Sequence, residues 1–149
     1  MVKLQALTAE EHIELNLKRK IMRYFLLTSI LLIAATSVFV SVALMSIPDG
    51  SLLGLNTNWL VNTRFHDYLT PGLILFLTLA IPAVSASYVN IIKHSKRYGW
   101  SIFTGVVLCL VSIVQGLYIV QLFWINTLML LFGLMIVSIA FQLKGKVMI

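Results

Sequence analysis

The longest hydrophobic stretches of this chain contain no ionisable side chain. Between Trp100 and Leu143 there are 44 consecutive residues without Asp, Glu, Lys, Arg or His. One helical crossing of a membrane needs about 20 such residues, so this stretch is long enough for two crossings. Two further charge-free runs extend over 24–47 and 70–92. A mean hydropathy of +0.98 and a charged fraction of 11% exclude an ordinary soluble domain, and the pattern predicts four membrane spans.

Cysteine is almost absent as well. The lone Cys109 lies inside the third predicted span, which excludes a disulfide framework and a Cys-x-x-Cys redox pair. No Asp, Glu or His lies inside any of the four spans. Ion-coupled transporters, intramembrane enzymes and haem proteins usually keep such groups at membrane depth. We therefore expect no cofactor, no metal ligand, no catalytic residue and no enzymatic activity.

The basic residues that are present gather at the ends of the spans. They form three groups: Lys18, Arg19, Lys20 and Arg23; Lys93, Lys96 and Arg97; and Lys144 and Lys146. With Lys3 these groups hold ten of the eleven basic residues, and Arg64 is the exception. The positive-inside rule then places both termini and the loop 93–97 in the cytoplasm and the loop 48–70 outside. The net charge of +6 thus indicates membrane topology, and no nucleic-acid partner is expected.

The segment before the first span has a mixed character. Thr8 and Glu11 have the spacing of a capping box, and 9–23 carries acidic residues at its start and basic residues at its end. We expect an N-terminal amphipathic interfacial helix over 9–23 that bends or runs into span one. A helix that docks a partner is the alternative. The polar residues ahead of the span argue against a cleavable signal peptide.

The predicted fold is an all-α membrane protein with one domain, 1–149. A bundle of four transmembrane helices follows the interfacial helix, with spans at about 24–47, 70–92, 100–121 and 124–143. Spans three and four are expected to turn within 121–126, where neither charge nor proline marks the boundary.

Prolines and caps predict the local structure of the outer loop and of span two. Pro48-Asp49-Gly50 fits a type I turn, and Asn56 is a candidate cap within the loop. Thr70-Pro71 fits the cap and first residue of span two. Pro82 removes a backbone donor from the middle of that span, so a kink is expected there.

Small residues recur along one side of span three. They are Ser101, Gly105, Cys109, Ser112 and Gly116, at steps of three or four residues. Small side chains let a neighbouring helix approach closely in lipid, so we interpret this stripe as a helix-packing seam within the bundle, in preference to a subunit interface. Leucine at Gly105 or Gly116 is expected to disrupt it.

Polar side chains gather toward the outer side of the predicted bundle. The candidate cluster consists of Asp49, Arg64, His66, Asp67 and Gln115. One hypothesis is a shared outer pocket. The other is that Arg64 pairs with Asp67 or Asp49 and fixes the loop. His66 beside Asp67 lacks a nucleophile or metal partner, which argues against acid–base catalysis.

Two motifs in the loop carry a resemblance. Pro48-Asp49-Gly50-x-x-x-Gly54 and Phe65-x-Asp67-Tyr68-x-x-Pro71-Gly72, with a glutamine in span three, resemble an uncharacterised family of small four-span bacterial membrane proteins. The likeness covers about 24–142 and implies a compact four-helix fold. It implies no activity, substrate or site residue.

Two functions agree with these observations. The first is a non-enzymatic protein of the bacterial inner membrane that acts as a structural or accessory partner in a membrane assembly, with another membrane protein or further copies of itself. The alternative is a binder of a small ligand or lipid, or a transporter subunit, that uses the outer polar pocket. In both cases the lipid bilayer is the surrounding partner.

Overall fold

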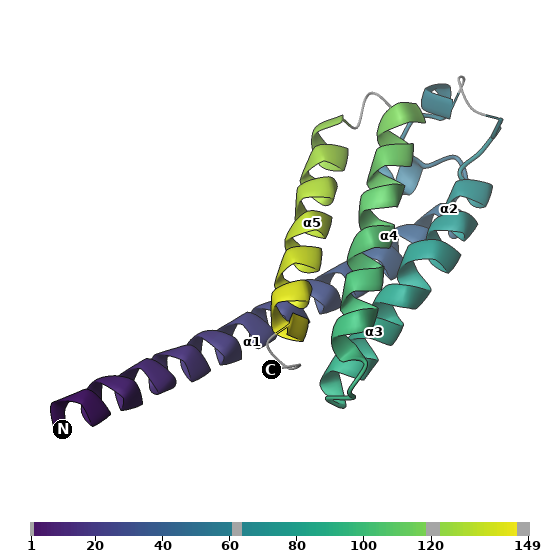
Figure 1. Cartoon of the computed structure of the whole chain (residues 1–149). Coiled ribbons are helices and arrows are strands. Elements are labelled where there is room, and N and C mark those ends of the chain that lie inside the picture. Colours follow the sequence, from purple (N-terminus) through teal and green to yellow (C-terminus); the bar gives the residue numbers. More distant parts are fainter. Residues whose placement is uncertain (1, 61–63, 119–122, 146–149) are drawn as a thin grey trace.

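The computed structural model describes residues 2–60, 64–118 and 123–145, and it confirms the all-α fold (Figure 1). All regular elements in these ranges are helical. Four stretches of the described chain are long and apolar enough to cross a membrane: Glu11–Ser46, Leu69–Ile91, Arg97–Leu117 and Trp124–Gly145. Each overlaps one predicted span, so the chain is a helical membrane protein.

The first element, α1 (Val2–Ser46), is one uninterrupted helix of 45 residues. The segment 9–23 is helical as expected and runs directly into span one. The predicted cap at Thr8 is wrong, because the helix already begins at Val2. At 1.5 Å per residue α1 is about 68 Å long, more than twice the apolar thickness of a bilayer. Its N-terminal part accordingly extends beyond the other helices (Figure 1).

The second span consists of three helical segments. They are α2 (Leu69–Leu75), the π-helical η3 (Phe76–Ala80) and α3 (Ile81–Ile91). The irregular turn ends at Ala80, two residues before Pro82, whose missing N–H prevents a regular α-helical hydrogen bond. A π-helical turn thus precedes Pro82, and the kink expected at this proline stays a prediction. The N-cap of the span is Tyr68 and not Thr70, so the predicted start is wrong by two residues.

The remaining spans are α4 (Arg97–Tyr118) and α5 (Phe123–Gly145), which pack side by side (Figure 1). Asn126 is already inside α5, so the expected turn within 121–126 ends earlier than predicted. Residues 119–122 of this connection lie outside the described part. Two side-chain hydrogen bonds join α4 to α3: Asn90 Nδ2 donates to Ser101 Oγ at 2.9 Å, and Thr104 Oγ1 donates to the carbonyl of Pro82 at 3.2 Å.

The small-residue stripe of α4 faces two neighbours. A Cβ atom added to Gly105 would lie 3.1 Å from the carbonyl oxygen of Gly133 in α5, and one added to Gly133 would lie 2.6 Å from Cys109 Sγ. Ser101 and Ser112 are buried, and Ser101 Oγ accepts the hydrogen bond from Asn90 of α3. Gly116 has more space around it, since a Cβ atom added there would lie 3.9 Å from the nearest atoms, which belong to Asn126. Close packing of α4 against α5 is therefore concentrated at Gly105 and Cys109.

The connection between α1 and α2 folds back onto one end of the bundle. Gly50 N–H donates to the carbonyl of Ile47 at 3.1 Å, which closes the predicted turn at Pro48-Asp49-Gly50. Two short 3₁₀ turns follow, η1 (Ser51–Leu53) and η2 (Thr57–Leu60). The Asn56 side chain accepts from Asn58 N–H at 2.9 Å and caps η2, as predicted. Leu60 and Tyr68 then pack on Leu44 of α1 and anchor the loop.

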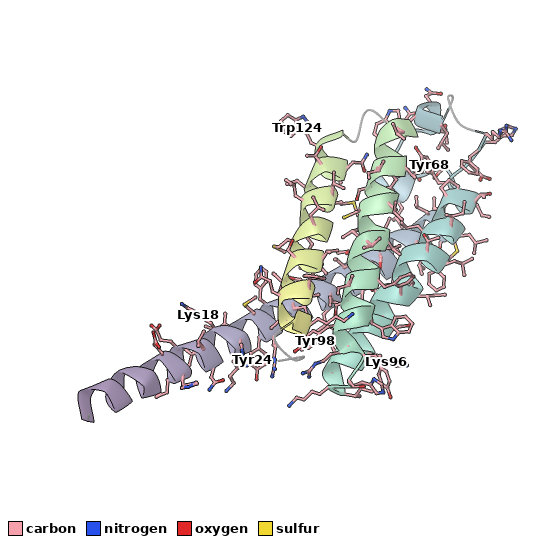
Figure 2. All side chains as sticks on the ribbon, in the orientation of Figure 1. Lys18, Tyr24, Tyr68, Lys96, Tyr98 and Trp124 are labelled. Carbon is pink, nitrogen blue, oxygen red and sulfur yellow. The ribbon has the colours of Figure 1, made fainter. Side chains whose placement is uncertain are left out.

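The two ends of the bundle therefore differ in character. One end carries η1 and η2, and is called the loop face below. The opposite end carries the α3–α4 connection and the end of α5, and is called the basic face. Figure 2 shows Tyr68 and Trp124 near the loop face, and Tyr24, Lys96 and Tyr98 near the basic face.

Candidate functional site

The predicted outer cluster does not form one site in the structure. Asp49 Oδ1 accepts hydrogen bonds from Ser51 N–H at 2.9 Å and Ser51 Oγ at 2.7 Å, and Asp67 Oδ1 accepts from Leu69 N–H at 3.2 Å. Arg64 and His66 are exposed, and the described residues include no ion pair between Arg64 and either carboxylate. The two aspartates thus order their own turns. The donated hydrogen bonds from Ser51 hold the pKa of Asp49 below its ordinary value.

Gln115, the fifth member of that cluster, lies in a separate groove. This groove of about 590 Å³ is bounded by α1 and α5, floored by α2, η3 and α4, and is called the α1–α5 groove below. Its apolar walls include Leu32, Leu75, Leu79, Leu108, Met129 and Phe132. It extends from the middle of the spans toward the loop face, where Leu53, Leu55 and Tyr68 close it.

Two amides stand at the loop-face end of this groove. Gln115 projects from α4 and Asn126 from α5, and both line the wall. Asn126 is only 6% exposed, and its Nδ2 has no hydrogen-bond partner within the described part of the chain. A buried amide donor without an acceptor is costly, so this end of the groove favours a ligand that brings an oxygen atom. The Tyr68 hydroxyl, in contrast, donates to the carbonyl of Asn56 at 2.9 Å.

A second cavity of about 400 Å³ lies at the basic face, where α1 passes the α3–α4 connection. We call it the basic pocket. The cations among its lining residues are Arg19, Lys20 and Arg23 from α1, Lys93 from the connection and Arg97 from α4. Asn16, Tyr24, Leu26, Leu27, Asn90 and Tyr98 complete the lining. No acidic residue is among them, and the described part of the chain shows no ion pair to any of the five cations.

Tyr98 connects the basic pocket to the core of the bundle. The residue is 4% exposed, its hydroxyl has no hydrogen-bond partner among the described residues, and the Arg97 guanidinium lies 4.7 Å from the centre of its ring. Arg19 Nε is likewise buried and finds no partner in the described ranges. The pocket therefore combines an excess of positive charge with polar hydrogens that lack acceptors.

Sequence reasoning missed the basic pocket although it identified every cation in it. The groups around Lys20 and Lys93 were interpreted only as a sign of topology. Their common position on one side of the membrane was a usable signal, because residues at the same depth can meet when their helices pack. The contact between α1 and α3 decides that they do meet.

Among the described residues, no group of three His, Cys, Asp or Glu side chains is arranged to hold a metal ion. Comparison of the chain with protein-family models, with curated proteins and with solved structures finds no match.

Proposed function

We propose that this chain is a non-enzymatic integral membrane protein that binds a lipid in the α1–α5 groove. The proposal places it in the bacterial inner membrane with both termini in the cytoplasm, so that the loop face is external. The observation that carries it is the groove itself. Its volume of about 590 Å³ falls within the range of ligand sites, and it lies along the membrane-spanning parts of α1 and α5.

The composition of the groove favours an acyl chain as its occupant. Leucine, isoleucine, methionine and phenylalanine side chains form most of the wall, and the groove lies at the depth of the lipid tails. Exposed Leu32 and Leu128 stand at its margins, so a chain can enter sideways from the bilayer. An acyl chain that lies in the groove makes packing contacts with its apolar side chains. Lipid that only surrounds the protein does not keep such contacts in one place.

The polar end of the groove favours a particular part of the lipid. Asn126 and Gln115 lie near the loop-face ends of α5 and α4, at the depth where the ester groups of that leaflet begin. An ester or hydroxyl oxygen there accepts the hydrogen bond that Asn126 Nδ2 lacks. A lipid bound with its tail toward the bundle centre satisfies both the apolar and the polar requirement.

Photocrosslinking tests this proposal. The full chain is reconstituted with phosphatidylcholine that carries a photoreactive group on one acyl chain, and adducts are mapped by mass spectrometry. Thr36 is exposed on α1 and lines the groove, so Thr36→Phe should fill its space. We expect adducts concentrated on groove residues in the wild type and at least halved in Thr36→Phe.

Thr28→Phe is the matched control. Thr28 is also exposed on α1, and both hydroxyls donate to carbonyls three and four residues earlier, but Thr28 does not line the groove. Adducts spread evenly over all lipid-facing helices, or equal losses in the two variants, contradict the proposal.

A second candidate function is that of an accessory partner in an assembly, favoured by the free N-terminal part of α1. Ile13, Leu17 and Ile21 are 64%, 60% and 59% exposed there. If this stretch holds copies of the chain together, native mass spectrometry in mild detergent should show an oligomer in the wild type and a monomer in Leu17→Glu. A wild-type monomer rules out self-assembly as this function.

A further inference from the structure

The basic pocket concentrates charge that nothing in the described structure neutralises. Arg19, Lys20 and Arg23 face Lys93 and Arg97 across about 400 Å³, and the described residues that line the space include no carboxylate. Like charges gathered around one cavity repel by amounts that grow as water is displaced from between them. An anion held among the cations removes this repulsion, and guanidinium groups bind phosphate oxygens through paired hydrogen bonds.

Tyr98 supplies an independent observation that also indicates an anionic ligand. Its hydroxyl is buried without a partner among the residues that the structure describes, and the residue lines the pocket, whereas buried hydroxyl groups normally have a hydrogen-bond partner. Arg19 Nε has the same unmet requirement. Arg19 Nε–H can only donate and the Tyr98 hydroxyl can donate, so phosphate oxygens, which accept, suit both groups.

The walls of the pocket differ between its two sides. Leu26 and Leu27 belong to the charge-free run of α1, while Arg19 and Lys20 lie on the part of the helix that precedes it. The cavity thus lies where the apolar span ends and the polar headgroups of a leaflet begin. Basic pockets between transmembrane helices at this depth suit the headgroups of anionic lipids.

We infer that the basic pocket binds a phosphate group through these five cations and the Tyr98 hydroxyl. A phospholipid headgroup and free phosphate share this chemistry. The site is separate from the α1–α5 groove, since the two cavities have no lining residue in common. The inference therefore does not depend on the function proposed above.

The test measures binding to the full chain in a neutral detergent. Three probes are added separately while thermal unfolding is followed: short-chain phosphatidylglycerol, short-chain phosphatidylcholine and inorganic phosphate. Phosphatidylglycerol should raise the Tm, with an effect that weakens at high salt. Lys20→Gln should weaken this binding about fivefold, because a basic residue near anionic lipid contributes about that factor.

Lys18→Gln is the matched control, because it removes the same charge from the same helix at an exposed position outside the pocket (Figure 2). Tyr98→Phe should weaken binding without lowering the Tm of the lipid-free protein, since the hydroxyl it removes has no partner there. If the hydroxyl only stabilised the fold, Tyr98→Phe would lower the Tm of the lipid-free protein and leave binding unchanged. Thr36→Phe should leave this binding unchanged, which separates the two sites.

The probes distinguish the source of the phosphate. A shift with phosphatidylglycerol that inorganic phosphate does not reproduce supports a lipid headgroup, and a full shift with inorganic phosphate supports a soluble ligand. The inference is overturned if neither anion shifts the Tm, if phosphatidylcholine acts as strongly as phosphatidylglycerol, or if Lys18→Gln and Lys20→Gln weaken binding equally.

Discussion

Lys93 has a backbone conformation that disfavours a side chain. Its φ is 54°, and it is the one non-glycine residue with positive φ in the described part of the chain. The left-handed region costs an L-residue about 1–2 kcal/mol, which glycine avoids at a smaller entropic cost. The lysine at this position therefore lowers the stability of the fold, and its side chain lines the basic pocket.

We therefore expect Lys93→Gly to raise the free energy of unfolding by about 0.5–1 kcal/mol while weakening phosphate binding. Lys96→Gly removes the same charge a few residues away, outside the basic pocket and at a position without positive φ. Thermal unfolding in detergent compares the two variants. Equal destabilisation by both contradicts the argument from strain.

Asp49 gives a prediction about pH. Its pKa is lowered from the ordinary value of 3.8, chiefly by the hydrogen bond from Ser51 N–H and then by that from Ser51 Oγ. Because the folded state favours the carboxylate, its contribution to loop stability is present above pH 3.8 and is lost as pH falls through the lower, folded pKa.

Ser51→Ala removes the hydroxyl donor and keeps the backbone donor. The pKa of Asp49 should therefore rise part of the way toward 3.8, as measured by NMR titration of the labelled carboxyl carbon. Ser95→Ala, in the exposed α3–α4 connection, should leave it unchanged. An unaltered Asp49 titration in Ser51→Ala would show that the hydroxyl makes no contribution.

Among the elements, the α4–α5 pair gives the sharpest packing prediction. A Cβ at Gly105 would lie 2.8 Å from Val137 Cγ2 and 3.1 Å from the Gly133 carbonyl oxygen, whereas at Gly116 the nearest atom would be 3.9 Å away. The stripe alone predicted similar effects at both glycines. The structure separates them, because α5 follows α4 closely at Gly105 and more loosely near Gly116.

Gly105→Ala should lower the free energy of unfolding by about 1–3 kcal/mol, the usual range for an overpacked contact. Gly116→Ala should cost much less, and Gly99→Ala, which meets open space on the same helix, serves as the control for helix propensity. Melting temperatures of the three detergent-solubilised variants provide the comparison. If Gly105→Ala has the same melting temperature as Gly99→Ala, α4 and α5 do not approach closely at Gly105.

At the scale of the whole molecule, the distribution of charge predicts an orientation. In a Cys109→Ser background, Asn58→Cys should react with an impermeant thiol reagent added outside intact cells, and Ser95→Cys should not. Both positions are exposed, at the loop face and the basic face respectively, so access depends on the side of the membrane. Labelling of Ser95→Cys alone would reverse the topology and place the basic pocket outside.

The pattern of apolar and charged residues predicted the helices of this protein and placed most of their ends within about three residues. Charge-free runs of about 20 residues must be helical in lipid, because a helix satisfies its backbone hydrogen bonds within one segment. The turn at Pro48-Asp49-Gly50, the cap at Asn56 and the irregularity before Pro82 are equally local. Two helix starts were predicted too late, at Thr8 and at Thr70. The residues before each threonine also adopt helical geometry, and no local signal in the sequence stops the helix from beginning there.

Which helix faces meet, and which polar residues share a cavity, depends on the packing of the helices and is not encoded locally. In lipid, apolar side chains gain little hydrophobic free energy by leaving one apolar neighbour for another, so hydropathy carries no information about the partner of each face. Gln115 was therefore grouped with Arg64 and Asp67, although it lies with Asn126 in the α1–α5 groove. The packing of α1 on α3 likewise brings Arg23 and Lys93 to one pocket, although they are far apart in the chain.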